Sequence, residues 1–299
     1  MTRSVVDVEG RCAVSNKPAT VHRRLQDPVI IPTPTRARPR KALGQHFLTD
    51  DRTLNRVLSA AEIGPEDTVL EVGPGRGTLT RRLVSRAAWV IVLELDPRLA
   101  AELPARLGGP PNLTVVEADA RKVDIGSLLG PDATYKVVGN LPYYAANLII
   151  RRFLESTPQP RLMVVMVQQE VARSMSAGLG KMGLLSVATQ FYAAPKVVCS
   201  VPPRLFRPPP KVTSALVRLE VRDKPAVDVA DPDAFFAVVR AGFSAPRKQL
   251  RNSLGQGLGV PGAVAGGLLA DLGLDGSLRP ANLSLEDWAM IYRAWDQLG

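Results

Sequence analysis

The stretch Val69-Leu-Glu-Val-Gly-Pro-Gly-Arg-Gly-Thr78 runs from a short β-type sequence into closely spaced glycines and then into a segment with helical spacing. Glycines at positions 73, 75 and 77 let a ligand approach the backbone closely, and the following helix presents free N–H groups at its positive end. A dinucleotide fingerprint requires glycine where this chain has Thr78. With Glu71 two residues before the first glycine, the loop instead favours a ligand made of a nucleoside and an amino acid, without a pyrophosphate.

Short apolar runs without strict polar alternation surround this loop and alternate with segments of helical spacing. This order is typical of an α/β fold with a mostly parallel sheet that helices cover on both faces. Seven strands are predicted, over residues 68–72, 89–95, 113–118, 135–140, 162–168, 196–201 and 213–221. Helices are predicted over residues 79–86, 98–107, 147–155 and 184–193. The last two strands flank a proline-rich turn at residues 202–210, so we expect them to close the sheet edge as a hairpin-like pair.

The composition divides the chain into three parts. Residues 1–40 contain eight basic and three acidic residues without a sustained period, which predicts a disordered basic leader. Residues 41–222 carry the α/β pattern, and residues 223–299 show no clear strand and form a predicted small all-helical domain. Its helices are predicted at residues 232–243, 247–254, 263–272 and 285–295, with Ser284 as the N-cap of the last one.

Composition also excludes several classes of protein. The 299 residues are 45% hydrophobic and 22% charged, which excludes a fibrous or wholly disordered chain. Two cysteines cannot form a disulfide framework or a four-ligand zinc site, and two histidines add little. Without a membrane-spanning run or a secretory signal, a cytoplasmic protein with no membrane and no metal is expected. The net charge of +10 indicates a polyanionic partner, either nucleic acid or an acidic membrane surface.

Two acidic residues stand where a nucleoside ligand would need them. Glu94 ends the second predicted strand and Asp119 ends the third, so both are expected at the carboxyl edge of the sheet, where ligands of open α/β folds bind. Glu94 can accept hydrogen bonds from both ribose hydroxyls, and Asp119 from an adenine amino group. The alternative for each is a capping carboxylate at a strand–helix junction.

The fourth predicted strand ends in Asn140-Leu-Pro-Tyr143. An exocyclic adenine amine is a poor nucleophile because its lone pair is delocalised into the ring. Hydrogen bonds from its N–H groups to the Asn140 side-chain oxygen and the Leu141 carbonyl would point that lone pair at a methyl donor. Tyr143 offers a stacking face for the base, worth roughly 1–3 kcal/mol. The alternative is a turn that merely ends a strand.

Seven motifs along the chain occur in an order and spacing that resemble those of a known family. They are Gly44-Gln-His-Phe-Leu48, Glu71-Val-Gly-Pro-Gly-Arg-Gly77, Glu94, Glu117-Ala-Asp119, Asn140-Leu-Pro-Tyr-Tyr144, Phe206-x-Pro-x-Pro-Lys-Val212 and Arg247-Lys-Gln-Leu-Arg-Asn252. In order and spacing they resemble the S-adenosylmethionine-dependent ribosomal RNA adenine N6,N6-dimethyltransferases. The resemblance covers about residues 41–299 and is greatest to the small-subunit branch, which dimethylates two adjacent adenosines near the 3′ end of that RNA.

The resemblance implies a Rossmann-like class I methyltransferase domain, a small C-terminal helical domain, and S-adenosyl-L-methionine as cofactor. It implies that His46 and Leu48 close over the donor, and that Phe206 sandwiches the target base against Tyr143. The position after Tyr143 is often Asn in this family and is Tyr144 here, so the hydrogen bonds on that side of the substrate stay unassigned. The other donor contacts expected from the resemblance and the glycine loop are Gly73, Gly75, Glu94, Asp119 and Asn140.

The implied partner is small-subunit ribosomal RNA in an immature small ribosomal subunit, bound by a monomeric protein. Two basic segments are then expected to hold the RNA backbone, and the leader either touches the same RNA or is a solvated tail without a role. The candidate RNA-binding residues are Arg204, Arg207 and Lys211 in the first segment and Arg247, Lys248 and Arg251 in the second.

Four other functions share parts of this pattern. A DNA adenine methyltransferase shares the chemistry but usually has Asp or Asn, two prolines and Tyr, where this chain has Leu141 before Pro142. A large-subunit ribosomal RNA adenine methyltransferase has the same motifs, although the helical tail and residues 247–252 favour the small-subunit branch. A non-catalytic ribosome-assembly or RNA-binding factor would keep the fold without the chemistry, and the intact acids, Asn140 and Tyr143 argue against it. A nicotinamide oxidoreductase is disfavoured by Thr78.

Overall fold

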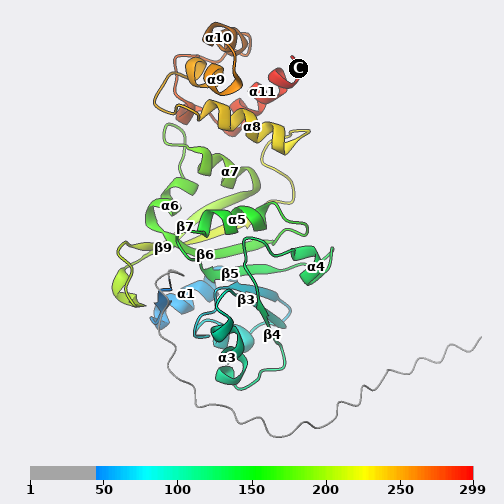
Figure 1. The fold of residues 1–299 in the computed structure, drawn as a ribbon, viewed down its shortest axis with the longest axis vertical. Coiled ribbons are helices and arrows are strands. Elements are labelled where there is room, and N and C mark those ends of the chain that lie inside the picture. The colour runs from blue at the N-terminus through cyan, green and yellow to red at the C-terminus, as the bar shows by residue number, and fades with distance from the viewer. Residues whose placement is uncertain (1–44, 299) are drawn as a thin grey trace, which may run out of the picture. The chain divides into compact units, whose positions relative to one another are not determined.

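The computed structural model describes residues 45–298, so the predicted leader at residues 1–40 lies outside the described residues. A seven-stranded sheet has the strand order β4-β3-β2-β5-β6-β9-β7 (Figure 1). Its strands are β2 Thr68–Val72, β3 Trp89–Glu94, β4 Leu113–Glu117, β5 Lys136–Asn140, β6 Leu162–Gln168, β7 Ala193–Val201 and β9 Ser214–Val221. The five strands from β4 to β6 are mutually parallel, and β9 is antiparallel to both β6 and β7. The predicted mostly parallel, seven-stranded sheet is therefore confirmed.

The order of the strands places a ligand site. The chain runs outward from β2 through β3 to β4, and then returns to β5 on the other side of β2. In open α/β sheets, ligands bind at the carboxyl ends of the strands at such a switch point. The glycine loop follows β2 and the Asn140 turn follows β5, so both lie at this point.

Helices cover the sheet on both faces. Successive residues of a strand point to opposite faces, so Val137 of β5 packs with α5 while Val138 packs with α1. Burial on both faces explains why these strands read as continuous apolar runs. The helices of this part of the chain are α1 Asp51–Ala61, α2 Thr80–Val84, α3 Pro97–Leu107, α4 Ile125–Leu129, α5 Ala146–Leu154, α6 Gln169–Met175 and α7 Leu184–Tyr192.

The closing pair of strands was predicted, but one of its boundaries was wrong. Strand β7 begins at Ala193 rather than at residue 196, and includes Pro195. Proline lacks an N–H, so it is tolerated where a strand has a neighbour on one side only. Because β7 pairs only with β9, it is the edge strand, and β9 lies inside the sheet between β6 and β7.

A second, two-stranded sheet was not predicted. Strand β1, Phe47–Leu48, pairs antiparallel with β8, Phe206–Arg207, which follows the 3-10 helix η2 (Pro203–Leu205). The backbone N–H and the hydroxyl of Thr49 both donate to the Leu205 carbonyl, at 3.0 and 3.1 Å. These contacts tie the N-terminal described residues to the proline-rich segment at residues 202–210.

The described residues after Val221 form helices and no strand, as predicted for this region. The helices are α8 Pro232–Gly242, α9 Leu250–Leu258, α10 Gly262–Asp271 and α11 Leu285–Asp296, with the 3-10 helix η3 at Pro280–Asn282. Ser284 is the N-cap of α11, in a capping box with Asp287. None of the helices between residues 45 and 298 has the length and apolar character needed to span a membrane.

Helix α9 differs from the prediction for residues 247–254. It starts later and continues past Gly255 and Gly257, which in isolation indicate the end of a helix. A Cβ atom on Gly257 would lie 2.3 Å from the Cα of Ala241 in α8. Glycine is therefore present at this position because the two helix backbones approach closely, and the tertiary contact outweighs its low helix propensity.

Two glycine substitutions should have opposite effects on stability. Gly257→Ala should lower the free energy of unfolding by about 2 kcal/mol, because the added methyl meets the backbone of α8. Gly267→Ala, on the exposed side of α10 with nothing within 4 Å of the added Cβ, should raise it by about 0.5–1 kcal/mol. Urea unfolding of both variants measures the difference, and equal effects would contradict the close approach of α8 and α9.

Candidate active site

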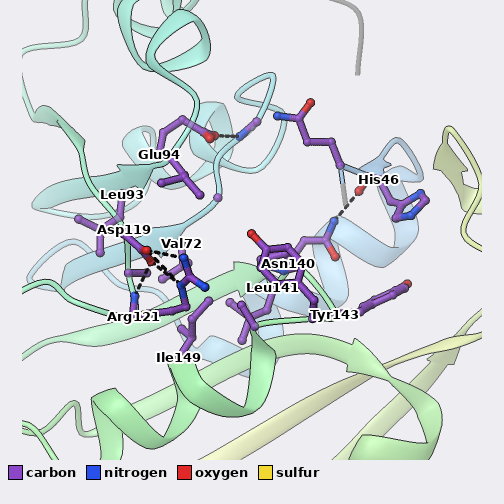
Figure 2. Close-up of a pocket in the computed structure, with 18 of the residues that line it drawn as sticks. His46, Val72, Leu93, Glu94, Asp119, Arg121, Asn140, Leu141, Tyr143 and Ile149 are labelled. Atoms are coloured by element: carbon purple, nitrogen blue, oxygen red, sulfur yellow. Dashed lines mark hydrogen bonds and ion pairs between the residues drawn. The ribbon is translucent and has the colours of Figure 1, made fainter. Parts of the chain in front are cut away.

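A pocket opens at the carboxyl ends of β2, β3, β4 and β5, closed on one side by residues 45–47 (Figure 2). The strand ends contribute residues that the sequence analysis selected from four separate motifs. The pocket-lining residues that the argument uses are His46, Gly73, Gly75, Glu94, Asp119, Arg121, Asn140, Leu141, Tyr143 and Tyr144.

The glycine loop adopts a backbone that favours glycine. Gly73 and Gly75 have φ values of +68° and +56°, in the left-handed region. A Cβ on Gly75 would lie 2.7 Å from the ring of Phe47, which covers the loop and carries the guanidinium of Arg76 at 4.9 Å from its centroid. The backbone of the loop is thus held between β2 and the N-terminal segment, with no side chain on its inner face.

Glu94 ends β3 as predicted and is 6% exposed. Its Oε2 accepts a hydrogen bond from the Gly75 N–H at 3.1 Å, and its Oε1 accepts one from the Asp96 N–H at 2.9 Å. Burial raises the pKa of Glu94, and these hydrogen bonds act in the opposite direction. A third hydrogen bond, with the backbone of Leu95, also lowers the pKa, and the carboxylate, with about four lone-pair directions, keeps room for a ligand hydroxyl.

Asp119 follows β4 two residues after its end, and Arg121 holds its carboxylate. The Arg121 backbone N–H and Nε each donate to Oδ1 at 2.9 Å, and Nη2 donates to Oδ2 at 2.6 Å. These bonds keep the pKa of Asp119 below its usual value. Nε also lies 3.0 Å from Oδ2, so each carboxylate oxygen already accepts two hydrogen bonds from Arg121, and the guanidinium becomes a wall of the pocket (Figure 2).

Asn140 is oriented by a hydrogen bond from its side chain. Its Nδ2 donates to the backbone carbonyl of His46 at 2.6 Å, which leaves Oδ1 as the acceptor of this side chain (Figure 2). The Leu141 N–H donates to the Met166 carbonyl of β6 at 3.2 Å, so the neighbouring strand also fixes the turn after β5. One amide thus joins the end of β5 to the N-terminal segment.

Tyr143 is held at both ends of its side chain. Its hydroxyl is 2.5 Å from the hydroxyl of Ser214, a fully buried residue of β9, and burial raises the pKa of Tyr143. Its ring is stacked with the ring of His46, at a centroid distance of 5.9 Å and an angle of 23°. The Nδ1 atom of His46 lies 2.9 Å from the Pro208 carbonyl, so the proline-rich segment in turn holds the imidazole.

Two predicted site residues do not reach this pocket. Phe206 is fully buried and packs in a cluster with Leu48, Leu54 and Met166, so here it cannot sandwich a base against Tyr143. Leu48 is 8% exposed and faces a smaller cavity behind the glycine loop. The physical reason is the pairing of β1 with β8, which turns both side chains towards the core while His46 takes the place opposite Tyr143.

The six candidate RNA-binding residues are all exposed. Arg204, Arg207 and Lys211 lie on or beside η2 and β8, and the other three lie in or just before α9. Within residues 45–298, no ion pair is formed by any of the six, so their charges are available to a partner. No group of three or more metal-ligating side chains is placed to hold a metal ion in the same range.

Fold and pocket together define a Rossmann-like methyltransferase. The family model described as "Ribosomal RNA adenine dimethylase" matches residues 36–295. The chain belongs to this family.

Similar proteins cover most of the chain. "Ribosomal RNA small subunit methyltransferase A" of Dehalococcoides mccartyi is 44% identical over 254 residues, which are 85% of this chain and 87% of that protein. The protein of the same name from Moorella thermoacetica is 43% identical over 265 residues, covering 85% and 92%.

Two solved structures have the same fold. A dimethyladenosine transferase from Plasmodium falciparum has a TM-score of 0.73 at 27% identity, covering 84% of this chain and 98% of that one. The 23S ribosomal RNA methyltransferase ErmE has a TM-score of 0.66 at 33% identity, covering 84% and 100%.

The sequence analysis missed two residues that position the site. Arg121 follows Asp119 by two residues, and a basic residue so close to a carboxylate that is predicted to bind the ligand was a usable signal. Ser214 gave none, because only the pairing of β9 with β6 brings its hydroxyl to Tyr143.

Glu71 is a second buried carboxylate next to the pocket. It is 2% exposed, and its Oε2 has no hydrogen-bond partner among the described residues. Burial raises the pKa of Glu71 to about 8, with the Thr80 hydroxyl acting against this and the charge of Glu94 adding to it.

The raised pKa of Glu71 predicts a pH dependence of stability. Between pH 4.5 and about 8 the folded protein holds a proton that the unfolded chain releases, so stability is lost as the pH rises through this window. Glu71→Gln should flatten this dependence. At pH 8.5 the free energy of unfolding of the variant should exceed that of the wild type by a few kcal/mol at most. Urea unfolding at pH 5, 7 and 8.5 tests this, with Glu117→Gln at an exposed position of β4 as the control. Parallel curves for wild type and Glu71→Gln would refute it.

Proposed function

We propose that this protein transfers methyl groups from S-adenosyl-L-methionine to N6 of two adjacent adenosines near the 3′ end of small-subunit ribosomal RNA, giving N6,N6-dimethyladenosine. The observation that carries the proposal is the Asn140 turn at the switch point of the sheet, with its amide oriented and two acidic residues beside it. Relatives at 43–44% identity that are named small-subunit methyltransferases support the choice of RNA.

The residues of the pocket fit the donor. The Glu94 carboxylate at the end of β3 suits the ribose hydroxyls. Asp119 lines the same pocket and suits the adenine amino group, which would share this carboxylate with Arg121. The bare backbone at Gly73 and Gly75 leaves room for the amino-acid part, and His46 closes the pocket from the N-terminal side. When bound, S-adenosyl-L-methionine supplies a methyl group on a sulfonium, which is already a strong electrophile.

The chain's own residues then have to position the amine. We infer that Oδ1 of Asn140 and the carbonyl of Leu141 accept the two N–H groups of the adenine, so that the nitrogen lone pair faces the methyl carbon. Tyr143, fixed through Ser214, supplies the stacking face. Such positioning accounts for much of a rate enhancement when the electrophile is strong. The proton leaves after transfer, when the nitrogen has become acidic.

The alternatives are less well supported. The 23S methyltransferase ErmE is 33% identical to this chain, whereas the small-subunit relatives reach 43–44%. A non-catalytic assembly factor would not need an oriented Asn140 beside Glu94, Asp119 and Tyr143. We propose a methyltransferase domain at residues 41–222 and an RNA-contacting helical domain at residues 223–299. An immature small subunit as the partner, a cytoplasmic location and a monomeric state stay predictions.

Asn140→Ala should reduce methyl transfer at least 100-fold and spare donor binding, since it removes one acceptor for the amine; loss of one such hydrogen bond in an active site typically costs about 10²–10³ in rate. Labelled transfer onto undermethylated small subunits, with nucleoside analysis for dimethyladenosine, gives the rate, and calorimetry gives the donor affinity. Asn147→Ala, at an exposed position in the first turn of α5, is the matched control. Near-normal turnover of Asn140→Ala would reject the orienting role.

The basic residues predict a salt dependence of RNA binding. If Arg204, Arg207 and Lys211 contact phosphates, replacing all three by Ala should reduce the slope of log K against log[salt] by roughly 0.7–0.9 per lost contact. Arg86→Ala, exposed before the amino end of β3, should leave the slope unchanged. An unaltered slope in the triple variant would remove these residues from the RNA interface.

A further inference from the structure

Tyr144 is an exposed aromatic residue at the mouth of the pocket. It follows Tyr143 in the same turn but is 54% exposed, while Tyr143 is half-buried and hydrogen-bonded. Leu95, 39% exposed, lines the same mouth from the end of β3. The chain thus leaves an apolar surface open beside the residues that orient the target amine, and the proposed reaction gives Tyr144 no role inside the pocket.

Arg121 gives this ring a fixed, positively charged neighbour. Its guanidinium lies over the Tyr144 ring at 5.9 Å from the centroid, within the range of a cation–π contact. The same guanidinium is anchored by the carboxylate of Asp119 through Nε and Nη2. A planar, charged group is therefore held over one face of an aromatic ring at the entrance, and neither is buried.

This combination suits a nucleotide better than a protein side chain. Bases outside a helix are held by stacking on aromatic rings or on Arg guanidinium planes, and the positive charge of Arg favours the phosphate chain. Within residues 45–298 the other exposed large aromatic residue is Trp89, at the amino end of β3 and hydrogen-bonded to Thr114. Tyr144 is therefore the exposed aromatic residue at the site of methyl transfer.

Building on the proposed function, we propose that Tyr144, together with Arg121, forms a stacking site for the unpaired base next to the target adenosine. When one of two adjacent adenosines enters the pocket, its neighbour is left at the mouth, where this surface is exposed. Stacking there would compensate for part of the stacking that the RNA loses when the target base turns out.

A cycle of protein and RNA changes tests the site directly. The affinities of the wild type and of Tyr144→Ala are measured for a single-stranded RNA with two adjacent adenosines, and for the same RNA with abasic nucleotides on both sides of one adenosine. Tyr144→Ala should weaken binding of the intact RNA roughly ten-fold and leave binding of the abasic RNA unchanged. Tyr144→Phe keeps the ring and should bind the intact RNA as the wild type does. Trp89→Ala should also keep the affinity of the wild type for this RNA. Calorimetry should give Tyr144→Ala the donor affinity of the wild type.

Steady-state kinetics on undermethylated small subunits give a second readout. Tyr144→Ala should raise KM for the subunit with little change in kcat, because the chemistry at Asn140 is untouched. The proposal is overturned if Tyr144→Ala loses equal affinity for both RNAs, binds both as the wild type does with an unchanged KM, or instead loses affinity for the donor. A wild type that shows the coupling to the neighbouring base but forms no dimethyladenosine would refute the proposed function and uphold the stacking site.

Discussion

The hydrogen bond from Nδ2 of Asn140 to the carbonyl of His46 joins the two halves of the site. It commits the amide nitrogen to the protein, so that the oxygen is the group presented to a ligand. It also holds residues 45–47 over the glycine loop, where the ring of Phe47 covers Gly75. The pairing of β1 with β8 and the contact of His46 with Pro208 hold the same segment, so loss of the bond would remove the oriented acceptor proposed for the target amine and leave the segment in place.

Two carboxylates of the site already have hydrogen-bond or ion-pair partners within the protein. Glu94 accepts hydrogen bonds from the backbone N–H groups of Gly75 and Asp96, and Asp119 is paired with Arg121. Both carboxylates that line the pocket are therefore held by the protein itself. Glu71 differs, because it is buried with one oxygen unpartnered and a raised pKa. A group of this kind lowers stability near neutral pH, and it borders the loop where a ligand is expected.

The entrance to the site is built from segments that are distant in sequence. Residues 202–210 hold the N-terminal segment through β8 and through the Pro208 carbonyl, and the same segment carries exposed Arg204 and Arg207. At the mouth of the pocket Tyr144 and Arg121 offer an aromatic and charged surface. A single-stranded RNA would therefore meet positive charge and a stacking surface before its base reaches Asn140.

The strands, the glycine loop, Glu94 and the Asn140 turn followed from local patterns, because strand periodicity, glycine φ preferences and strand-end acids are properties of neighbouring residues. Local patterns did not predict the burial of Phe206 and Leu48, the role of Ser214 or the length of α9. Each of these depends on a contact between segments that are distant in sequence. The β1–β8 pairing buries Phe206 and brings His46 to Tyr143, and the approach of α8 keeps glycine inside α9. Sequence alone determined which chemical groups stand at the ends of the strands. Tertiary packing decided which of them face the pocket, since a side chain turns towards the core or the ligand only when its partners across the fold are in place.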